Sequence, residues 1–304
     1  MRITPVYPTP RIWVLLFLTS FAIATSCGSP PQTKKNNEAT EKIPSRSALD
    51  VQIDTYWDRF DFSDSSWVVH VDTAEQALVD YLYLLQQASA QKADSAMRSL
   101  LARAKRNPKI FDFFNTTYQR YLYDPNSPMR NEKLYESVLG FGIDSTDIAA
   151  HEKDRLQAKL RLIRRNNPGE KAENFSYQTR SGSPHKLYDL QATHLLLLFY
   201  EPGCASCEET IETLKQMPAI TEAIQRGSLN ILAIYATGNL EVWQKHQNTI
   251  PDSWIDGIDT EQAILGNNLY DLKASPTMYL LDHNKKVILK DAPLGQVMQY
   301  LQGR

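Results

Sequence analysis

Hydrophobic residues between positions 50 and 167 recur with the spacing of helix faces. Three sets stand at i, i+3, i+4 and i+7, which places each set on one apolar stripe of a helix. The sets are Leu78, Tyr81, Leu82 and Leu85; Met97, Leu100, Leu101 and Ala104; and Ile110, Phe113, Phe114 and Thr117, the last continued by Tyr118 and Tyr121. Thr73-Ala74-Glu75-Gln76 has the pattern of a capping box ahead of the first set. With two more helices expected near 131–140 and 146–165, the pattern predicts an all-α domain over 50–167.

The pattern changes after Asn166-Asn167-Pro168-Gly169, a strong breaker that predicts a domain boundary. Residues 195–200 (LLLLFY) and 229–236 (LNILAIYA) are continuous apolar runs, typical of strands buried on both faces. Further elements are expected in the order helix around Trp243, helix over 261–270, hairpin over 277–290, and a final helix with the stripe Leu294, Val297, Met298 and Leu301. This order predicts an α/β domain with a mixed central sheet flanked by helices over 168–304.

The first 26 residues have the pattern of an export signal. Two arginines precede the run IWVLLFLTSFAIA, which carries no charge and is short for a membrane-spanning helix. The run ends at Ala24-Thr25-Ser26-Cys27-Gly28, which resembles the lipobox of bacterial lipoproteins, with Ala24 where leucine is commonest. The resemblance implies lipid attachment at Cys27 and anchoring to a membrane through that lipid. A plain signal peptide with an incidental cysteine is the alternative.

Composition adds to this prediction of an exported protein. Residues 27–49 form a polar stretch with Pro and Ser, which predicts a flexible tether. A net charge of -2 over 304 residues disfavours a dedicated nucleic-acid binder, which is usually basic. We expect the protein in the cell envelope. No acidic cluster of the kind linked to surface export follows Cys27, which favours a periplasmic face over surface exposure.

Two of the three cysteines, Cys204 and Cys207, lie in EPGCASCEET, directly after the first buried strand. The predicted helix begins there, so the thiolate of Cys204 lies at the positive end of the helix dipole. Cys207 follows about one turn later, close enough to form a disulfide, which persists in an oxidising compartment. We therefore interpret Cys204 as a nucleophile and Cys207 as the thiol that resolves a mixed disulfide.

Other readings of the cysteine pair are less well supported. A zinc site needs further ligands, and the histidines of this half stand far apart in the sequence, so no metal is expected. A structural disulfide remains open, although so small a loop gives little chain-entropy stabilisation. A peroxidase of the same fold would need threonine three residues before its reactive cysteine, where this chain has Glu201.

The stretch LLLLFYEPGCASCEE, followed some seventy residues later by Ser275-Pro276-Thr277, resembles a thioredoxin-fold domain of the TlpA/ResA type. The entry at 171–175 (KAENF) is also similar, and the resemblance covers roughly 169–304. It implies that Pro276 is cis and faces the cysteines, and that the loop of Ser275, Pro276 and Thr277 receives an extended substrate segment. It further implies a redox-active Cys204–Cys207 disulfide with no other cofactor.

The helical half carries a second resemblance. Residues 56–64 (YWDRFDFSD) and 121–135 (YLYDPNSPMRNEKLY) resemble an uncharacterised helical domain that precedes thioredoxin-like domains in lipoproteins of Bacteroides-type bacteria. Together the resemblances imply a cell-envelope thiol–disulfide oxidoreductase. Its substrates would be protein thiols and disulfides, and an upstream protein would supply electrons. The role of the helical half is not implied by the family.

This chain departs from the thioredoxin pattern near the cysteines. Gly203 stands where tryptophan is usual, and Leu198 and Thr210 replace two acids of related proteins. The usual proton acceptor for the second cysteine is therefore absent from its place, and Glu201 or Glu209 could replace it.

Acidic residues flank the cysteine pair and bear on the direction of electron flow. Like charge from Glu201, Glu208 and Glu209 is expected to disfavour the Cys204 thiolate. A less stabilised thiolate favours the disulfide, so a reductase or isomerase is predicted over a disulfide-introducing enzyme. The alternative from another class is a lipid-anchored binding or assembly module whose disulfide is structural or vestigial. Exposed aromatic residues in 50–70 would favour that module.

Overall fold

The computed structural model describes residues 47–68 and 71–302 of the 304-residue chain. The predicted signal peptide, the predicted lipidation site Cys27 and almost all of the predicted tether lie outside the described residues. Among the helices of the described ranges, none combines the length and the hydropathy needed to cross a membrane.

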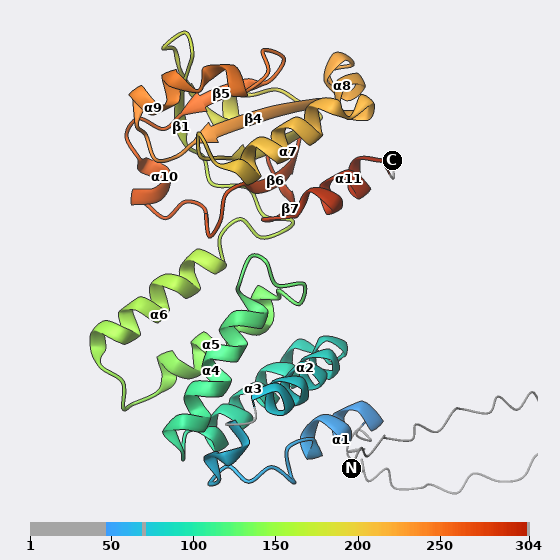
Figure 1. Cartoon of the computed structure of the whole chain (residues 1–304), viewed down its shortest axis with the longest axis vertical. Coiled ribbons are helices and arrows are strands. Elements are labelled where there is room, and N and C mark those ends of the chain that lie inside the picture. The colour runs from blue at the N-terminus through green and yellow to red at the C-terminus, as the bar shows by residue number, and fades with distance from the viewer. Residues whose placement is uncertain (1–46, 69–70, 303–304) are drawn as a thin grey trace, which may run out of the picture. The chain divides into compact units, whose positions relative to one another are not determined.

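Six α-helices and one 3-10 turn form the helical domain, which the structure describes from Ser47 onwards (Figure 1). They are α1 (Ala48–Thr55), η1 (Ser65–Val68), α2 (Val71–Gln87), α3 (Ala90–Ala104), α4 (Pro108–Leu122), α5 (Glu132–Asp144) and α6 (Ala150–Ile163). Side chains of Ser47, Ser89, Asn107 and Asn131 accept hydrogen bonds from the first turns of α1, α3, α4 and α5. The capping box expected at Thr73 is wrong, because α2 already begins at Val71 and Thr73 lies within its first turn.

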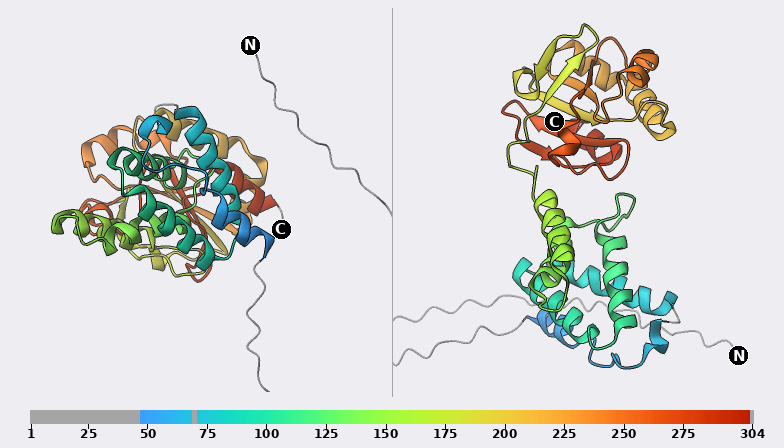
Figure 2. Two further views of the ribbon diagram at one scale, coloured as in Figure 1. Left: turned by 90° about the horizontal axis from the view of Figure 1, so that it is seen from below. Right: turned by 90° about the vertical axis from the view of Figure 1, so that its left-hand side faces the viewer.

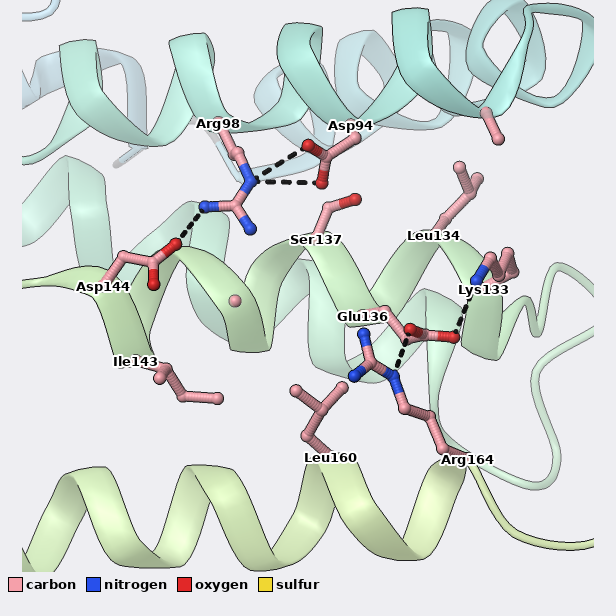
Figure 3. Close-up of a pocket in the computed structure, with 12 residues that line it drawn as sticks. Asp94, Arg98, Lys133, Leu134, Glu136, Ser137, Ile143, Asp144, Leu160 and Arg164 are labelled. Atoms are coloured by element: carbon pink, nitrogen blue, oxygen red, sulfur yellow. Dashed lines mark hydrogen bonds and ion pairs between the residues drawn. The ribbon is translucent and has the colours of Figure 1, made fainter.

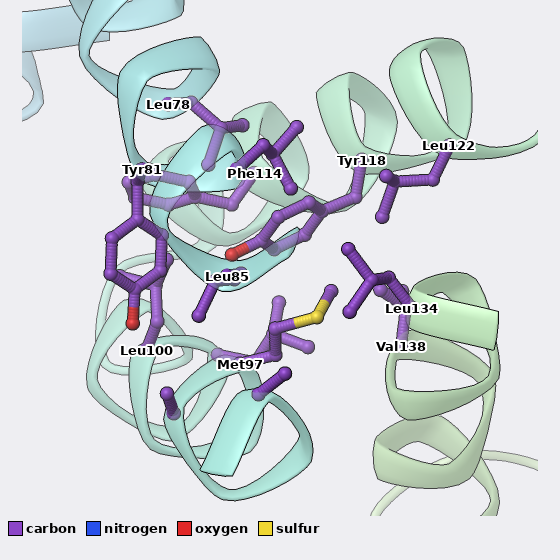
Figure 4. Packing of buried hydrophobic residues seen from close by; sticks show 14 of the residues in the cluster. Leu78, Tyr81, Leu85, Met97, Leu100, Phe114, Tyr118, Leu122, Leu134 and Val138 are labelled. Carbon is purple, nitrogen blue, oxygen red and sulfur yellow. The ribbon is translucent and has the colours of Figure 1, made fainter. Parts of the chain in front are cut away.

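The predicted apolar stripes form the core of this domain (Figure 4). Met97 and Tyr118 lie at its centre with no exposed surface, between the stripes of α2, α3, α4 and α5. The aromatic segment ahead of α2 packs onto the same core, where Trp57 contacts Phe114 edge to face at 5.3 Å between ring centroids. Of the aromatic residues in 50–70, Trp67 stays exposed. The aromatics of this segment therefore serve mainly the core.

The second domain has a seven-stranded mixed sheet in the order β2-β1-β5-β4-β3-β6-β7. Its strands are drawn as arrows in the right-hand view of Figure 2. The strands are β1 (Ser176–Thr179), β2 (Pro184–Lys186), β3 (His194–Phe199), β4 (Leu229–Tyr235), β5 (Ile255–Ile258), β6 (Thr277–Asp282) and β7 (Val287–Leu289). The pairs β3–β4 and β4–β5 are parallel, and the remaining pairs are antiparallel. The two apolar runs are the central strands β3 and β4, and the predicted hairpin is β6–β7.

Layers on both faces of the sheet explain why β3 and β4 are apolar throughout. Alternate residues such as Leu196 and Leu198 pack with the helices α7 (Ala205–Gln216), α8 (Pro218–Gln225), α9 (Leu240–Lys245) and α11 (Leu294–Gln302). The alternate residues that point to the other face, such as Leu195 and Leu197, pack with chain segments near 172–190 and 264–272. The helix expected over 261–270 is reduced to α10 (Ala263–Gly266), because Gln262 and Asn268 on either side adopt left-handed backbone conformations. The predicted α/β architecture is confirmed.

Candidate active site

Cys204 lies at the N-terminal end of α7, immediately beyond β3, as the sequence predicts. It is the N-cap residue, and its carbonyl accepts the first helical hydrogen bond from the Glu208 N–H at 3.0 Å. Gly203 before it has a φ of 78°, in the left-handed region that favours glycine. A tryptophan at this position would be strained, so the departure from the family pattern follows from the local backbone.

The two cysteines differ in exposure and in acidity. Both are free thiols; Cys204 is partly exposed, whereas Cys207 is buried. Burial raises the pKa of Cys207 to about 12, with further contributions from its hydrogen bond to Cys204 and from the charges of Cys204 and Glu201. The site therefore pairs an accessible thiol with a shielded one that holds its proton.

The pKa of Cys204 lies below its ordinary value. Burial alone would raise this pKa, but hydrogen bonds from the Cys207 thiol and the Ser206 hydroxyl, joined by backbone N–H groups of both residues, outweigh it. The expectation that the Cys204 thiolate is poorly stabilised is therefore wrong. Donors in direct contact with the sulfur outweigh the acids of the surrounding segment.

The Ser275–Pro276 peptide bond is cis, as the resemblance implies, and its loop contacts the cysteine helix. The Ser275 carbonyl oxygen lies 3.8 Å from the Cys204 sulfur and accepts a hydrogen bond from the Ser206 hydroxyl at 2.9 Å. Thr277 is buried at the start of β6, and its hydroxyl donates to the Ala274 carbonyl at 2.6 Å. The structure thus brings the loop and the cysteine pair together.

The two acids considered as proton acceptors lie in different surroundings. Glu201 accepts a hydrogen bond from the Thr237 hydroxyl at 2.7 Å, and its charge contributes to the raised pKa of Cys207. Glu209 instead lies on an exposed face of α7 and lines a surface depression with Asn248 and Thr249. Glu201 therefore differs from Glu209 in that its charge raises the pKa of the Cys207 thiol.

Two residues near Cys204 were not identified from the sequence. Ser206 lies between the cysteines, and its hydroxyl oxygen is 3.1 Å from the Cys204 sulfur. The Nε2 atom of His246 lies 3.6 Å from the position that a Cβ on Gly203 would occupy, and its Nδ1 lies 2.9 Å from the Val242 carbonyl oxygen. Ser206 could have been found from its place in the motif, whereas His246 follows it by forty residues with no signal in between.

No group of three or more His, Cys, Asp or Glu side chains within the described ranges is gathered in a way that could hold a metal ion. The chemistry that this arrangement can support is thiol chemistry. It has an accessible thiol of lowered pKa, a buried partner thiol one turn away and a carboxylate that acts on the buried thiol.

Comparison with known proteins agrees with this geometry. Residues 53–166 match a family model described as a domain of unknown function, DUF5106. The thioredoxin-like protein YneN of Bacillus subtilis is 30% identical over 132 residues, which are 42% of this chain and 71% of YneN.

Solved structures from Bacteroides are also similar to this chain. A thioredoxin-like protein from Bacteroides caccae is 41% identical, with a TM-score of 0.76 over 84% of this chain and 92% of that chain. The C-terminal domain of an uncharacterized protein from Bacteroides fragilis is 46% identical and covers 45% of this chain and 98% of its own, with a TM-score of 0.44. From its fold and the similarity to YneN, the chain belongs to the thioredoxin-like proteins.

Proposed function

We propose that this protein is a thiol–disulfide oxidoreductase of the cell envelope. The observation that carries the proposal is the pairing of a partly exposed Cys204 of lowered pKa with a buried Cys207 of raised pKa. Only a thiolate attacks a disulfide, so such a pair starts an exchange at one sulfur and completes it at the other.

The reaction has two steps, written here for reduction of a substrate disulfide. The Cys204 thiolate attacks one substrate sulfur; the substrate S–S bond breaks, a mixed disulfide forms, and the other substrate sulfur leaves as a thiolate that takes up a proton. Cys207 then loses its proton to Glu201 and attacks the Cys204 sulfur, which releases the second substrate thiolate. Two electrons pass from the pair to the substrate, and the Cys204–Cys207 disulfide remains for an upstream dithiol protein to reduce.

We propose Ser275, Pro276 and Thr277 as the substrate-facing loop. Contact of the Ser275 carbonyl with Cys204 and Ser206 supports this role, because a segment bound there lies next to the nucleophile. Glu201 is preferred to Glu209 as the proton acceptor, since its charge acts on Cys207.

The proposal also covers the direction of electron flow and the location of the protein in the cell. The lowered pKa of Cys204 removes the argument from acidic neighbours for a reductase, because a stabilised thiolate favours the dithiol form and a more oxidising couple. A measurement of the reduction potential of the pair then decides between a reductase or isomerase and a disulfide-introducing enzyme. The lipobox-like stretch supports anchoring to a membrane by lipid at Cys27, and the lack of an acidic cluster in the residues after Cys27 favours a folded part that faces the periplasm.

Trapping of the mixed disulfide tests the proposed function. The Cys207→Ser variant should accumulate a mixed disulfide with a reducible protein substrate such as insulin, because the resolving thiol is missing. Cys204→Ser should form none, and the wild-type protein should catalyse turnover with dithiothreitol as donor. Wild-type turnover no faster than that of Cys204→Ser would contradict the proposal and favour the binding module with a structural disulfide.

A further inference from the structure

Oppositely charged side chains from the two domains meet in a buried cluster. Glu132, the first residue of α5, contacts the ammonium group of Lys273 and lies 2.8 Å from that of Lys290. The side chains of Lys273 and Lys290 are only 6% and 7% exposed, and that of Glu132 is 16% exposed. The helical domain thus supplies a carboxylate to two lysines of the thioredoxin-like domain.

Further groups complete the surroundings of Lys273. Its Nζ lies 3.4 Å from an Asp271 oxygen and 3.3 Å from an Asp291 oxygen, and 4.5 Å from the centroid of the Tyr123 ring. The Tyr123 hydroxyl donates to Asp271 at 3.0 Å, and Arg130 pairs with Asp291 at 2.8 Å. Lys273 is therefore held from several sides, and the helical domain supplies Glu132, Tyr123 and Arg130 to the cluster.

Because the cluster is buried, its charged groups must keep their positions relative to one another. Desolvation would neutralise Glu132, yet the two lysines lower its pKa, so the carboxylate stays charged. Desolvation also lowers the pKa of Lys273, but Glu132, Asp271 and Asp291 more than reverse this effect. Charged groups taken out of water tolerate little displacement, because their attraction must offset the loss of hydration.

The cluster lies at the base of the loop that contacts the cysteines. Lys273 precedes Ser275 by two residues, and the Ser275 carbonyl accepts from Ser206 and lies 3.8 Å from the Cys204 sulfur. Only Ala274 separates Lys273 from Ser275, and neighbouring Cα atoms are about 3.8 Å apart along the chain. A displacement of the backbone at Lys273 therefore has a short path to the Ser275 carbonyl in the active site.

We propose that the helical domain positions the Ser275–Pro276 loop through the ion pair between Glu132 and Lys273. Glu132 is a positioning residue, and this role rests on the proposed function of the cysteine pair. The helical half thereby gains a part in the chemistry, since it sets how close the Ser275 carbonyl stays to Cys204 and Ser206.

The position of the loop affects Cys204 through one hydrogen atom. The Ser206 hydroxyl has a single hydrogen, and both the Ser275 oxygen at 2.9 Å and the Cys204 sulfur at 3.1 Å are within its reach. When the carbonyl withdraws, this hydrogen, otherwise shared between the two acceptors, is donated to the Cys204 thiolate alone. Withdrawal also removes the negative end of the carbonyl dipole from the thiolate. Both changes stabilise the thiolate.

The test compares Glu132→Gln with Glu136→Gln in the full-length protein in detergent. Glu136 lies one turn further along α5 and is similarly buried, but it pairs with Arg164 and Lys133 inside the helical domain (Figure 3). The readout is the pH dependence of Cys204 alkylation by iodoacetamide, resolved by peptide mass.

We expect Glu132→Gln to lower the pKa of Cys204 by about half a unit and to raise alkylation at pH 7 about two-fold, since nucleophilicity falls with pKa. Glu136→Gln should leave both values at those of the wild type. In a Ser206→Ala background the effect of Glu132→Gln should shrink to less than half, because the two changes share one hydrogen bond. Equal shifts in both glutamine variants, or no shift in a folded Glu132→Gln, would overturn the proposal.

A second variant and the choice of alkylation as readout allow a negative result to be interpreted. Should Glu132→Gln fail to fold, Glu132→Asp keeps the charge but shortens its reach towards Lys273 and Lys290, and a smaller shift of the same sign is expected; its absence counts against the proposal. Alkylation reports on loop position even in a protein without turnover. Loss of turnover in the wild type would therefore remove the proposed function, while an unshifted Cys204 pKa in Glu132→Gln would remove only the positioning role.

Discussion

At the scale of single residues, Glu201 differs from the other acids of the site because it acts on the buried thiol. Its charge helps to hold the proton on Cys207, whose pKa is raised to about 12. A thiol of that acidity is a poor nucleophile at neutral pH unless a neighbouring base takes its proton as it attacks. We propose Glu201 as that base; its carboxylate accepts a hydrogen bond from the Thr237 hydroxyl at 2.7 Å.

Replacement of Glu201 by Gln should slow release of the mixed disulfide at pH 7 by about 100-fold, the lower end of the range for loss of a general base. Glu209→Gln is the matched control and should leave the rate unchanged. The direction of the change in release rate is decisive. If Glu201 acted only through its charge, its removal would lower the pKa of Cys207 and speed release. Rapid-quench kinetics with alkylation of each species measures this rate, and a faster Glu201→Gln would show that Glu201 is not the acceptor.

The chemistry-bearing residues divide into those that the sequence predicts and those that only the fold reveals. Cys204 and Cys207 were selected from their spacing at the start of a helix, whereas Ser275–Pro276 was identified through the resemblance to the TlpA/ResA type. His246 and Glu132 carry no motif, because their positions depend on how α9 returns towards Gly203 and how α5 meets the loop at 271–276. The error about Cys204 acidity arose because charges were counted along the sequence, whereas the sulfur responds to the donors that contact it.

At the scale of secondary-structure elements, prediction succeeded where burial imposes a long pattern. The stripes of α2, α3, α4 and α11 and the continuous apolar runs of β3 and β4 each extend over several residues and were predicted, whereas α1 and α8 were not. The strands β1, β2 and β5 were missed because they have three or four residues each, which is too few for a period. Pro184 in β2 and Gly257 in β5 also weaken any strand signal.

Within the helical domain, the start of α5 should matter more to the active site than the start of the other helices. Asn131 caps α5 by accepting from the Leu134 N–H at 3.1 Å, and Glu132 is the next residue. Ser89 caps α3 in the same way, through the Lys92 N–H at 3.2 Å.

We expect Asn131→Ala and Ser89→Ala each to lower the free energy of unfolding by about 1 kcal/mol, the usual value of a lost cap. Urea denaturation measures this loss. Only Asn131→Ala should also speed Cys204 alkylation, since fraying of α5 loosens Glu132. Equal alkylation rates in the two variants would argue that α5 does not act on the loop.

At the scale of the whole molecule, two domains with separate cores are joined by polar contacts. The cluster around Glu132 is one group of them, and another lies near the domain boundary, where Asn166 donates to the Leu269 carbonyl at 2.8 Å. No stripe or run in the sequence pointed to these contacts, because charged side chains read as surface until a partner covers them. The segment 271–276 is therefore contacted by the helical domain near Lys273 and by the cysteine helix at Ser275.

The account depends first on Cys204 and Cys207 being a reversible redox couple. The measurement that tests this most directly is the reduction potential of the pair, from equilibration of the full-length protein with thiol buffers and counting of free thiols by alkylation mass shift. We expect a potential of about -180 to -270 mV, the range of thiol–disulfide catalysts, with the lower end indicating a reductase. A pair that stays oxidised below about -300 mV would behave as a structural disulfide and would contradict the account.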